Sequence, residues 1–301
     1  MGTVVRVELA HNDPREAANA AEAVMQEMHR IDHAMSPYKP ESELSRINRE
    51  AAHGTVSISQ EMFGLIRRSI GFSQWSGGAF DITFAAVGRF YDYRNRVRPG
   101  DAQVAHALPA FNYRHLLLDP ERLTIRFAHS EVQIDLGGIA KGYAVDNCVR
   151  LLESRGVRAG MVSAGGDSRV FGLRDGRPWI IGIRDPRRSD GMIARLPLVD
   201  AAISTSGDYE RYFDEDGVRH HHILDPATGR SPVGVRAVTV VGPDAVTTEG
   251  LSKSVFIKGV HEGLTWVNSM SDVDAVVIDA TGRMFYSDGL RQPEPGTDSA
   301  Q

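Results

Sequence analysis

The sequence contains a single cysteine in 301 residues, Cys148, which excludes an internal disulfide and a cysteine-rich metal site. Long apolar runs are also missing, and none approaches the roughly 18 residues that a membrane-spanning helix needs. Basic charge is not in excess, because 34 Lys and Arg stand against 39 Asp and Glu, a net charge of −5 at pH 7. Non-specific nucleic-acid binding needs a basic surface, so nucleic acid is not expected as a partner. Cys148 shares an apolar helix face with its neighbours and is predicted to be a core thiol.

The composition is that of a globular protein, with 42% hydrophobic and 24% charged residues. The expected helices and strands alternate irregularly, which favours an α+β fold over a doubly wound sheet. No linker or internal repeat divides the chain. We therefore expect one domain over residues 1–290, built of two closely packed lobes. Residues 291–301 contain two prolines and no apolar anchor, and we expect them to form a flexible tail.

Capping signals and apolar spacing predict the main elements. Asp13 and Pro14 are typical of a helix start, and apolar residues then recur at helical spacing. Helices are predicted over residues 14–33, 59–75, 140–155, 248–256 and 261–270. Strands are predicted over residues 4–9, 115–118, 123–127, 131–135, 159–164, 178–184, 193–198 and 275–279. The segment 35–48 is turn-rich and is predicted to be a loop.

Three Gly-Gly pairs carry the first chemical signal: Gly77-Gly78, Gly137-Gly138 and Gly165-Gly166. Glycine lets the backbone approach a ligand closely, and a helix N-terminus offers free N–H groups to phosphate. Lys141 follows the second pair at the start of a predicted helix and adds a positive charge. Each pair alone can equally be an ordinary turn. Together they indicate several loops that converge on one polar ligand.

A run of three histidines, His220 to His222, follows a hydroxyl-rich segment that contains Thr205 and Asp208. Adjacent side chains in a strand point to opposite faces, so the three cannot bind one metal ion together. One inward histidine acting as general base is the better interpretation, and a polar edge strand is the alternative. Glu249 and Lys253 lie four residues apart on a predicted helix, a spacing that is typical of a solvated surface ion pair.

These segments, in this order, resemble the ApbE family of FAD:protein FMN transferases. The resemblance spans almost the whole chain. The matching stretches are residues 1–3, 35–38, 42–48, 78–83, 135–146, 165–167, 205–209 and 222–229.

The resemblance implies an enzyme that transfers the FMN half of FAD to a Ser or Thr hydroxyl of a target protein, releasing AMP with the help of Mg²⁺. It implies an α+β fold related to the tunnelling fold, with mixed or antiparallel sheets and flanking helices, and with FAD held between the lobes. His222 would deprotonate the acceptor hydroxyl, and the Ala140 carbonyl would bind the metal. The implied FAD-lining residues are Met35, Ala79, Phe80, Asp81, Gly137, Lys141 and Ile223. The acceptor would present a short motif that ends in Gly-Ala-Thr or Gly-Ala-Ser.

The chain departs from the family pattern at the two side chains that the resemblance assigns to the metal. The pattern has Asp and Thr where this sequence has Glu249 and Lys253. Glu249 keeps a carboxylate, but protonated Lys253 cannot bind a metal ion. Both changes should weaken a Mg²⁺ site, which demands near-octahedral oxygen geometry. We hypothesise that the Lys253 ammonium takes over part of the metal's task, pairing with Glu249 and the diphosphate.

Two other functions use the same residues. A flavin-binding or carrier protein would keep the FAD site without transfer, and an FAD pyrophosphatase would use water in place of the acceptor hydroxyl. The resemblance also implies function in the periplasm or at a membrane anchor outside the cytoplasm, behind a leader that is missing from this chain. A cytoplasmic protein is the alternative.

Overall fold

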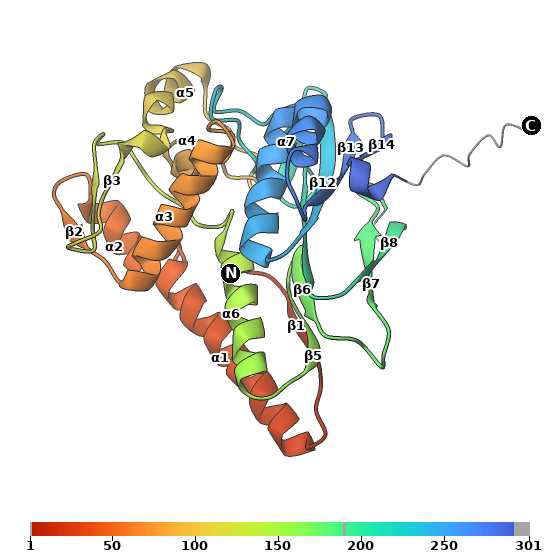
Figure 1. The fold of residues 1–301 in the computed structure, drawn as a ribbon. Helices are drawn as coiled ribbons and strands as arrows, with labels where there is room; N and C mark the ends of the chain where they lie inside the picture. The colour runs from red at the N-terminus through yellow and green to blue at the C-terminus, as the bar shows by residue number, and fades with distance from the viewer. Residues whose placement is uncertain (1, 189–190, 292–301) are drawn as a thin grey trace, which may run out of the picture.

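The computed structural model describes residues 2–188 and 191–291, and its centre is a seven-stranded sheet (Figure 1). All six pairs of neighbouring strands are antiparallel. In spatial order the strands are β1 (Val5–Ala10), β5 (Ala159–Ala164), β6 (Asp167–Phe171), β9 (Ala201–Gly207), β12 (Val235–Gly242), β13 (Asp274–Asp279) and β14 (Met284–Tyr286). The α+β prediction is confirmed.

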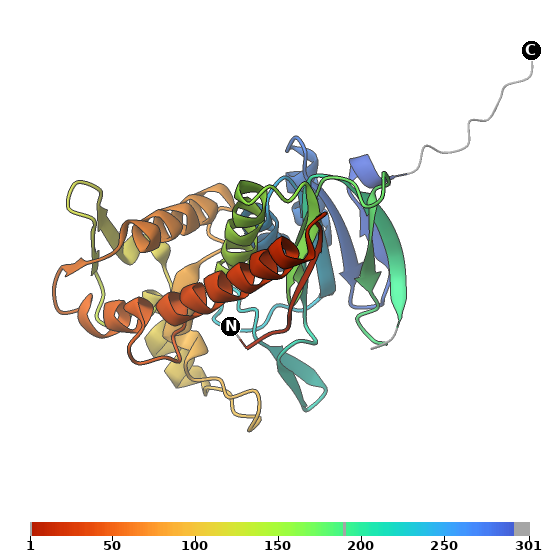
Figure 2. The same ribbon diagram turned by 90° about the horizontal axis from the view of Figure 1, so that it is seen from below.

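Helices cover one face of this sheet. Helix α6 (Ala140–Ser154) packs on β5 and β6, and α7 (Ala245–Asn268) packs on β9 and β12. Helix α1 (Pro14–Met35) packs on the outer side of α6, and α2 (Glu43–Glu50) and α3 (Gln60–Trp75) lie farther from the sheet (Figure 2). The described residues contain no helix with the length and hydrophobicity needed to cross a bilayer.

The smaller elements lie at the periphery. A three-stranded sheet, in the order β2-β4-β3, lies beyond α2 and α3 (Figure 1). The smaller strands are β2 (Val56–Ser57), β3 (Leu116–Asp119), β4 (Thr124–Phe127), β10 (Tyr212–Glu215) and β11 (Val218–His221). The short helices are η1 (Ile82–Phe84), α4 (Ala85–Gly88), α5 (Asp101–Ala107), η2 (Leu108–Ala110), η3 (Tyr113–His115) and η4 (Asp288–Leu290).

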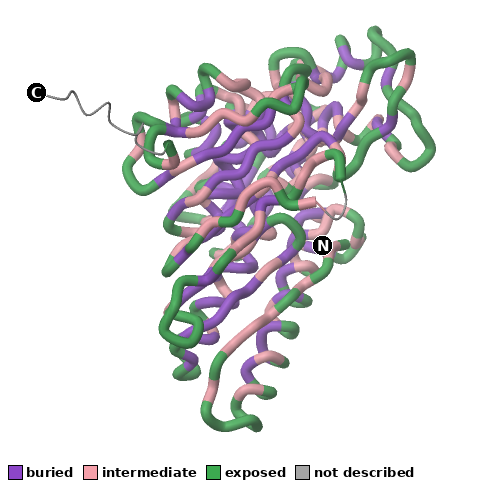
Figure 3. The backbone as a smooth tube through the Cα atoms, turned by 90° about the vertical axis from the view of Figure 1, so that its right-hand side faces the viewer, coloured by how far each residue is buried: buried purple, intermediate pink, exposed green. Residues whose placement is uncertain are grey.

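The other face of the seven-stranded sheet is covered by the hairpin β7 (Trp179–Arg184) and β8 (Met192–Leu198). Side chains alternate between the two faces, as strand geometry requires. On β5, for example, Val162 belongs to the core under the helices, whereas Met161 belongs to the core under the hairpin. The central strands are therefore buried on both faces (Figure 3).

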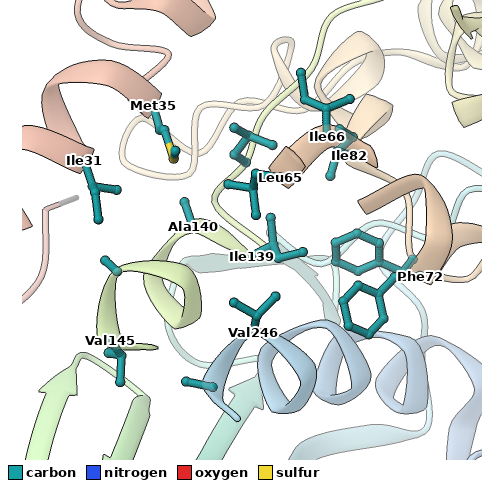
Figure 4. Packing of buried hydrophobic residues seen from close by; sticks show 14 of the residues in the cluster. Ile31, Met35, Leu65, Ile66, Phe72, Ile82, Ile139, Ala140, Val145 and Val246 are labelled. Carbon is teal, nitrogen blue, oxygen red and sulfur yellow. The ribbon is translucent and has the colours of Figure 1, made fainter. Parts of the chain in front are cut away.

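Side chains from α1, α3, α6 and α7 meet in the main core (Figure 4). Ile139, directly before α6, lies near Phe72 of α3 and Val246 of α7. Cys148 is fully buried in this core, as predicted, and burial raises the pKa of its thiol to about 12. The thiol is therefore held protonated and unreactive at neutral pH.

The crossing of α6 and α7 is exceptionally close and is stabilised by two buried carboxylates. A Cβ atom on Gly142 would lie 2.2 Å from the Ala245 carbonyl oxygen, so the two backbones meet where only glycine fits. Asp146 of α6 accepts hydrogen bonds of 3.0 Å from the N–H groups of Ala245 and Val246, at the start of α7. Glu249 of α7 accepts a 2.7 Å bond from the Gly142 N–H, in the first turn of α6. Each helix thus caps the N-terminus of the other.

The structure differs from the predicted elements in two segments. The loop predicted over 35–48 contains the start of α2, where the Ser42 hydroxyl accepts a bond from the Ser45 N–H and caps the helix. The strand predicted over 131–135 is wrong, because this extended segment pairs with no strand in the part of the chain that the structure describes. The Asn48 side chain instead pairs with both backbone groups of Ile134, at 2.8 Å each.

The remaining predictions hold with shifted bounds. The two helices predicted over 248–256 and 261–270 form α7, which is kinked at Gly259, a residue with φ of 78°. Strands β6, β9 and β12 were not assigned a range from the sequence. Of the tail predicted over 291–301, residues 292–301 lie outside the described residues.

Replacing Gly142 by alanine should force α6 and α7 apart. We expect Gly142→Ala to lower the free energy of unfolding by about 2–4 kcal/mol, because the new methyl group meets backbone that cannot rotate away. Gly71→Ala in α3 is the matched control, since no atom lies within 4 Å of the added Cβ and alanine favours a helix. Urea unfolding measures both variants. Equal stability of the two would show that the helix crossing tolerates a side chain.

Candidate functional site

Two lysines and two carboxylates meet where α6, α7 and β6 come together. Lys141 Nζ lies 2.8 Å from Glu249 Oε1 and also donates to the Asp167 carboxylate. Lys253 Nζ lies 3.1 Å from the same Glu249 oxygen. The carboxyl groups of Asp167 and Glu249 are almost completely buried, whereas parts of the lysine side chains reach solvent. We call Lys141, Asp167, Glu249 and Lys253 the charge cluster.

Glu249 is held by the protein on both of its oxygens. Oε1 accepts from the two lysines, and Oε2 accepts from the Gly142 N–H. The interpretation of Glu249 and Lys253 as a solvated surface pair is wrong, because Glu249 is 0% exposed. Burial acts to lower the pKa of Lys141, but Asp167 and Glu249 outweigh it and the pKa is raised. Burial lowers the pKa of Lys253, with a further lowering from the Lys141 charge.

Hydroxyl groups extend the charge cluster along the sheet. Ser204 of β9 lies opposite Asp167 of β6 in the strand register and donates to its carboxylate. Ser206, two residues on, lies on the same face, and its hydroxyl is 2.8 Å from the Ser252 hydroxyl of α7. Thr205 points to the other face and pairs with Thr239 at 2.9 Å. The hydroxyls thus belong to β9 itself rather than to a loop after a strand.

The predicted glycine loops have different roles. A Cβ on Gly138 would lie 3.4 Å from the Phe80 ring and 3.8 Å from the Lys253 side chain, so this loop lies close to both. Gly77 and Gly78 have positive φ angles and end α3, where the Gly78 N–H bonds the Ser73 carbonyl at 2.7 Å. The Gly165-Gly166 pair forms the turn between β5 and β6 and leads directly into Asp167. Two of the three pairs therefore adjoin the charge cluster.

The other predicted FAD-lining residues are distributed unevenly. Lys141 is in the charge cluster, Gly137 is exposed beside it, and Ala79 is half-buried next to Phe80. Met35, Phe80 and Ile223 are buried in the main core.

Asp81 is buried and used within the protein. Its carboxylate accepts bonds from the Thr83 N–H and hydroxyl, at 2.8 and 2.6 Å, and from the Tyr113 N–H at 2.7 Å. Burial raises the pKa of Asp81 despite these bonds. The side chain caps η1 in this structure, and its contact with FAD stays a prediction.

The three histidines diverge, as strand geometry predicted. His220 lies 4.0 Å from Glu215, and His221 Nε2 pairs with the Pro232 carbonyl at 3.1 Å. The Nδ1 atom of His222 is buried without a hydrogen-bond partner among the described residues. Burial of the ring lowers the pKa of His222 to about 3. Further lowering comes from the positive charges of nearby groups, namely His221, Lys253, Arg211 and Lys141.

Asp208 anchors the segment that carries His222. Its carboxylate pairs with both terminal nitrogens of Arg187, at 2.8 and 2.9 Å, and lies 3.5 Å from Arg219 of β11. These arginines, and Arg211 with its charge near His222, were not singled out from the sequence. Arg187, Arg219 and Arg211 lie 35, 3 and 11 residues from His222, and no regular spacing marks them in the sequence.

The charge cluster is a poor fit for Mg²⁺. An ion at the roughly 2 Å Mg–O distance from Glu249 Oε1 would lie within about 5 Å of both lysine nitrogens. Repulsion from each ammonium would cost roughly 6 kcal/mol at an effective dielectric constant of 20. Within residues 2–188 and 191–291, no group of three or more His, Cys, Asp or Glu side chains is placed to hold a metal ion. The side chains at the positions implied for the metal therefore form an ion pair with each other.

Comparisons with known proteins agree over nearly the full chain. The model of the ApbE family matches residues 1–277. The FAD:protein FMN transferase of Treponema pallidum is 29% identical over 309 residues, which cover 96% of this chain and 85% of that protein. The transferase of the same name from Vibrio cholerae is 34% identical over 243 residues, 78% of this chain and 72% of that protein.

Solved structures give the same result. The crystal structure of the ApbE protein from Thermotoga maritima superposes with a TM-score of 0.88 at 35% identity, covering 96% of this chain and 94% of that one. The flavin transferase ApbE of Vibrio cholerae superposes with a TM-score of 0.85 at 28% identity and the same two coverages.

The lowered pKa of His222 predicts a pH-dependent stability. The unfolded chain protonates this histidine below about pH 6.5, whereas the folded protein does so only near pH 3. The unfolded state therefore binds more protons in this range, and stability falls as the pH decreases. Between pH 7.5 and 5.5 the His222 contribution should be about 1 kcal/mol.

Urea unfolding at the two pH values tests this prediction. His222→Gln should lose about 1 kcal/mol less than the wild type over this interval. His53→Gln, at an exposed position, is the control and should behave as the wild type. If His222→Gln left the pH dependence of stability unchanged, His222 would titrate at the same pH in the folded and unfolded states.

Proposed function

The chain belongs to the ApbE family, and from this we propose that it is an FAD:protein FMN transferase. It moves the FMN part of FAD to a Ser or Thr hydroxyl of an acceptor protein and releases AMP. The observation that carries the proposal is the buried His222, whose neutral form is favoured by burial and by the charges of Lys141 and Lys253, the two lysines that donate to Glu249. This reaction needs a base that accepts the hydroxyl proton and positive charge that neutralises the diphosphate.

The proposed transfer consists of one bond formed, one bond broken and one proton accepted by His222. The acceptor hydroxyl oxygen attacks the phosphorus on the riboflavin side of FAD, and its proton passes to a ring nitrogen of His222. An oxygen–phosphorus bond forms to the acceptor, and the bond from this phosphorus to the bridging oxygen breaks. The electron pair remains on the AMP phosphate, which leaves. Positioning and charge neutralisation supply most of the catalysis in phosphoryl transfer.

Bound FAD would change the properties of His222. A base with a pKa of about 3 is weak, and the positive charges of Lys253, Lys141 and Arg211 contribute to this low value. The diphosphate brings negative charge to the same surroundings and offsets them. The pKa of His222 should therefore rise when FAD binds, which makes the histidine a better base in the complex than in the free protein.

The glycine loop before α6 suits the remainder of the diphosphate. Gly137 is exposed, and Gly138 lies close to both Phe80 and Lys253. The backbone of this loop leads into the N-terminus of α6, whose dipole favours anions. We assign the loop to the phosphate groups and the Phe80 segment to the adjoining part of FAD.

The acceptor is a second protein, and we propose that it offers its hydroxyl in an exposed segment ending in Gly-Ala-Thr or Gly-Ala-Ser. Small residues around the hydroxyl would let it approach His222 without steric conflict. The family resemblance further favours an acceptor in the periplasm or at the outer side of a membrane.

His222→Ala tests the proposed base. The rate of FMN transfer to a Gly-Ala-Thr peptide should fall about 10²–10⁴-fold, whereas FAD binding should persist. Mass spectrometry of the peptide measures transfer, and quenching of flavin fluorescence measures binding. His220→Ala is the neighbouring control and should keep most of the activity, because His220 lies against Glu215.

Product analysis separates the competing functions. Free FMN with AMP, and no labelled peptide, would identify a pyrophosphatase. Intact FAD retained on the protein would identify a carrier.

The change in His222 on FAD binding predicts two different pH profiles. The acid limb of kcat/KM reports the free enzyme, and that of kcat reports the FAD complex. Since the diphosphate raises the pKa of His222, the acid limb of kcat should lie about one pH unit or more above that of kcat/KM. Steady-state transfer rates from about pH 2.5 to 9 test this, because the free-enzyme limb is expected near pH 3. If the acid limbs of kcat and kcat/KM fell at the same pH, His222 would not be the titrating base.

A further inference from the structure

We propose that the ammonium group of Lys253 supplies the positive charge at the FAD diphosphate that a divalent cation would otherwise supply, so that transfer needs no bound metal ion. This inference rests on the proposed function and adds the identity of the cation. Lys253 makes no covalent bond in the reaction. Its ammonium stabilises the charge that moves to the departing AMP phosphate.

The hydrogen bonds of Lys253 leave room for this role. An ammonium group has three donors, and among the described residues Nζ has one hydrogen-bonded partner, Glu249 Oε1 at 3.1 Å. The Lys253 side chain is 16% exposed and that of Lys141 is 25% exposed, so the two lysines differ in their hydrogen bonds rather than in their exposure. Lys141 differs, because it bonds to both Asp167 and Glu249. Of the two lysines in the charge cluster, Lys253 is therefore the freer to meet a ligand.

The position of Lys253 is that of a diphosphate ligand. Its Cδ and Cε atoms lie 3.8 Å from the Cβ position of Gly138, in the loop that leads into α6. The nitrogen therefore lies beside the helix N-terminus and the exposed glycine loop. Lys253 also acts on His222, whose pKa it lowers, so one charge faces both the base and the proposed phosphate site.

Glu249 holds this charge in place and at the same time cannot serve a metal ion. Hydrogen bonds from the Gly142 N–H and from Lys141 hold its buried carboxylate in one position. Lys253 bonds to this carboxylate, so its ammonium group is held as well. A preoriented charge needs no reorganisation during the reaction. The cluster contains two ammonium groups and two carboxylates and is formally neutral without a metal ion. The two negative charges of a diphosphate can therefore pair directly with the two ammonium groups.

The first experiment compares transfer to a Gly-Ala-Thr peptide with excess EDTA and with Mg²⁺. The wild type should have the same rate in both within about twofold. Lys253→Thr removes the ammonium and leaves a hydroxyl beside Glu249. Its rate in EDTA should fall about 10²–10³-fold, as on removal of a transition-state donor, and should recover in part with Mg²⁺. Lys258→Thr, on the same helix but paired with Glu262, is the matched control and should resemble the wild type.

The second experiment needs no activity. Electron paramagnetic resonance of added Mn²⁺ should show no binding to the wild type at millimolar Mn²⁺ and one bound ion in Lys253→Thr. FAD affinity, from flavin fluorescence, should be the same in EDTA and Mg²⁺ for the wild type. The FAD affinity of Lys253→Thr should be about tenfold or more weaker in EDTA, because one charge-assisted hydrogen bond is lost. This affinity should recover with Mg²⁺.

The outcomes separate the two proposals. Loss of wild-type transfer in EDTA with recovery in Mg²⁺, or a Mn²⁺ ion bound to the wild type, overturns the role of Lys253 and leaves the transferase function intact. Absence of transfer under every condition contradicts the transferase function, and the Mn²⁺ and FAD measurements then still decide whether Lys253 replaces a metal ion. These wild-type measurements do not depend on the folding of any variant.

Discussion

The close crossing of α6 and α7 is the constraint on which the charge cluster depends. Gly142 lets the two backbones meet, and Asp146 and Glu249 each cap the N-terminus of the opposite helix. Both carboxylates are buried, so each must find donors within the protein. The capping role of Glu249 fixes its position, and this brings Lys141 and Lys253 to a single oxygen atom.

A buried ion cluster of this kind is weak evidence for stability, because desolvation of the charges can exceed their attraction. Its position near an exposed glycine loop and a histidine of lowered pKa, His222, is typical of a functional site. The sheet completes the arrangement, since the pairing of β6 with β9 sets Ser204 opposite Asp167. The charge cluster therefore lies on the side of the sheet under the helices, whereas a second apolar core lies under the β7–β8 hairpin.

The structure places Glu249 and Lys253 in an environment that their sequence spacing does not indicate. In the sequence, Glu249 and Lys253 have the spacing of a solvated ion pair, and the family resemblance assigns both positions to a metal ion. In the folded chain the pair is buried on the Glu249 side and joined to a second lysine. A carboxylate oxygen that already accepts from two ammonium groups is a different chemical environment from a Mg²⁺ ligand.

The sequence by itself determined the helices with regular apolar spacing, such as α1 with its Asp13 cap, and the family with its proposed reaction. Local chemistry in the sequence also singled out the histidine run, Lys141 and the glycine loops, and the family resemblance selected His222 within that run. Only the tertiary structure decided that Asp167 and Glu249, 82 residues apart, share Lys141, and that Asn48 replaces a strand partner for Ile134. These contacts depend on strand register and on the distance between two helix axes, which are set by packing between segments remote in sequence.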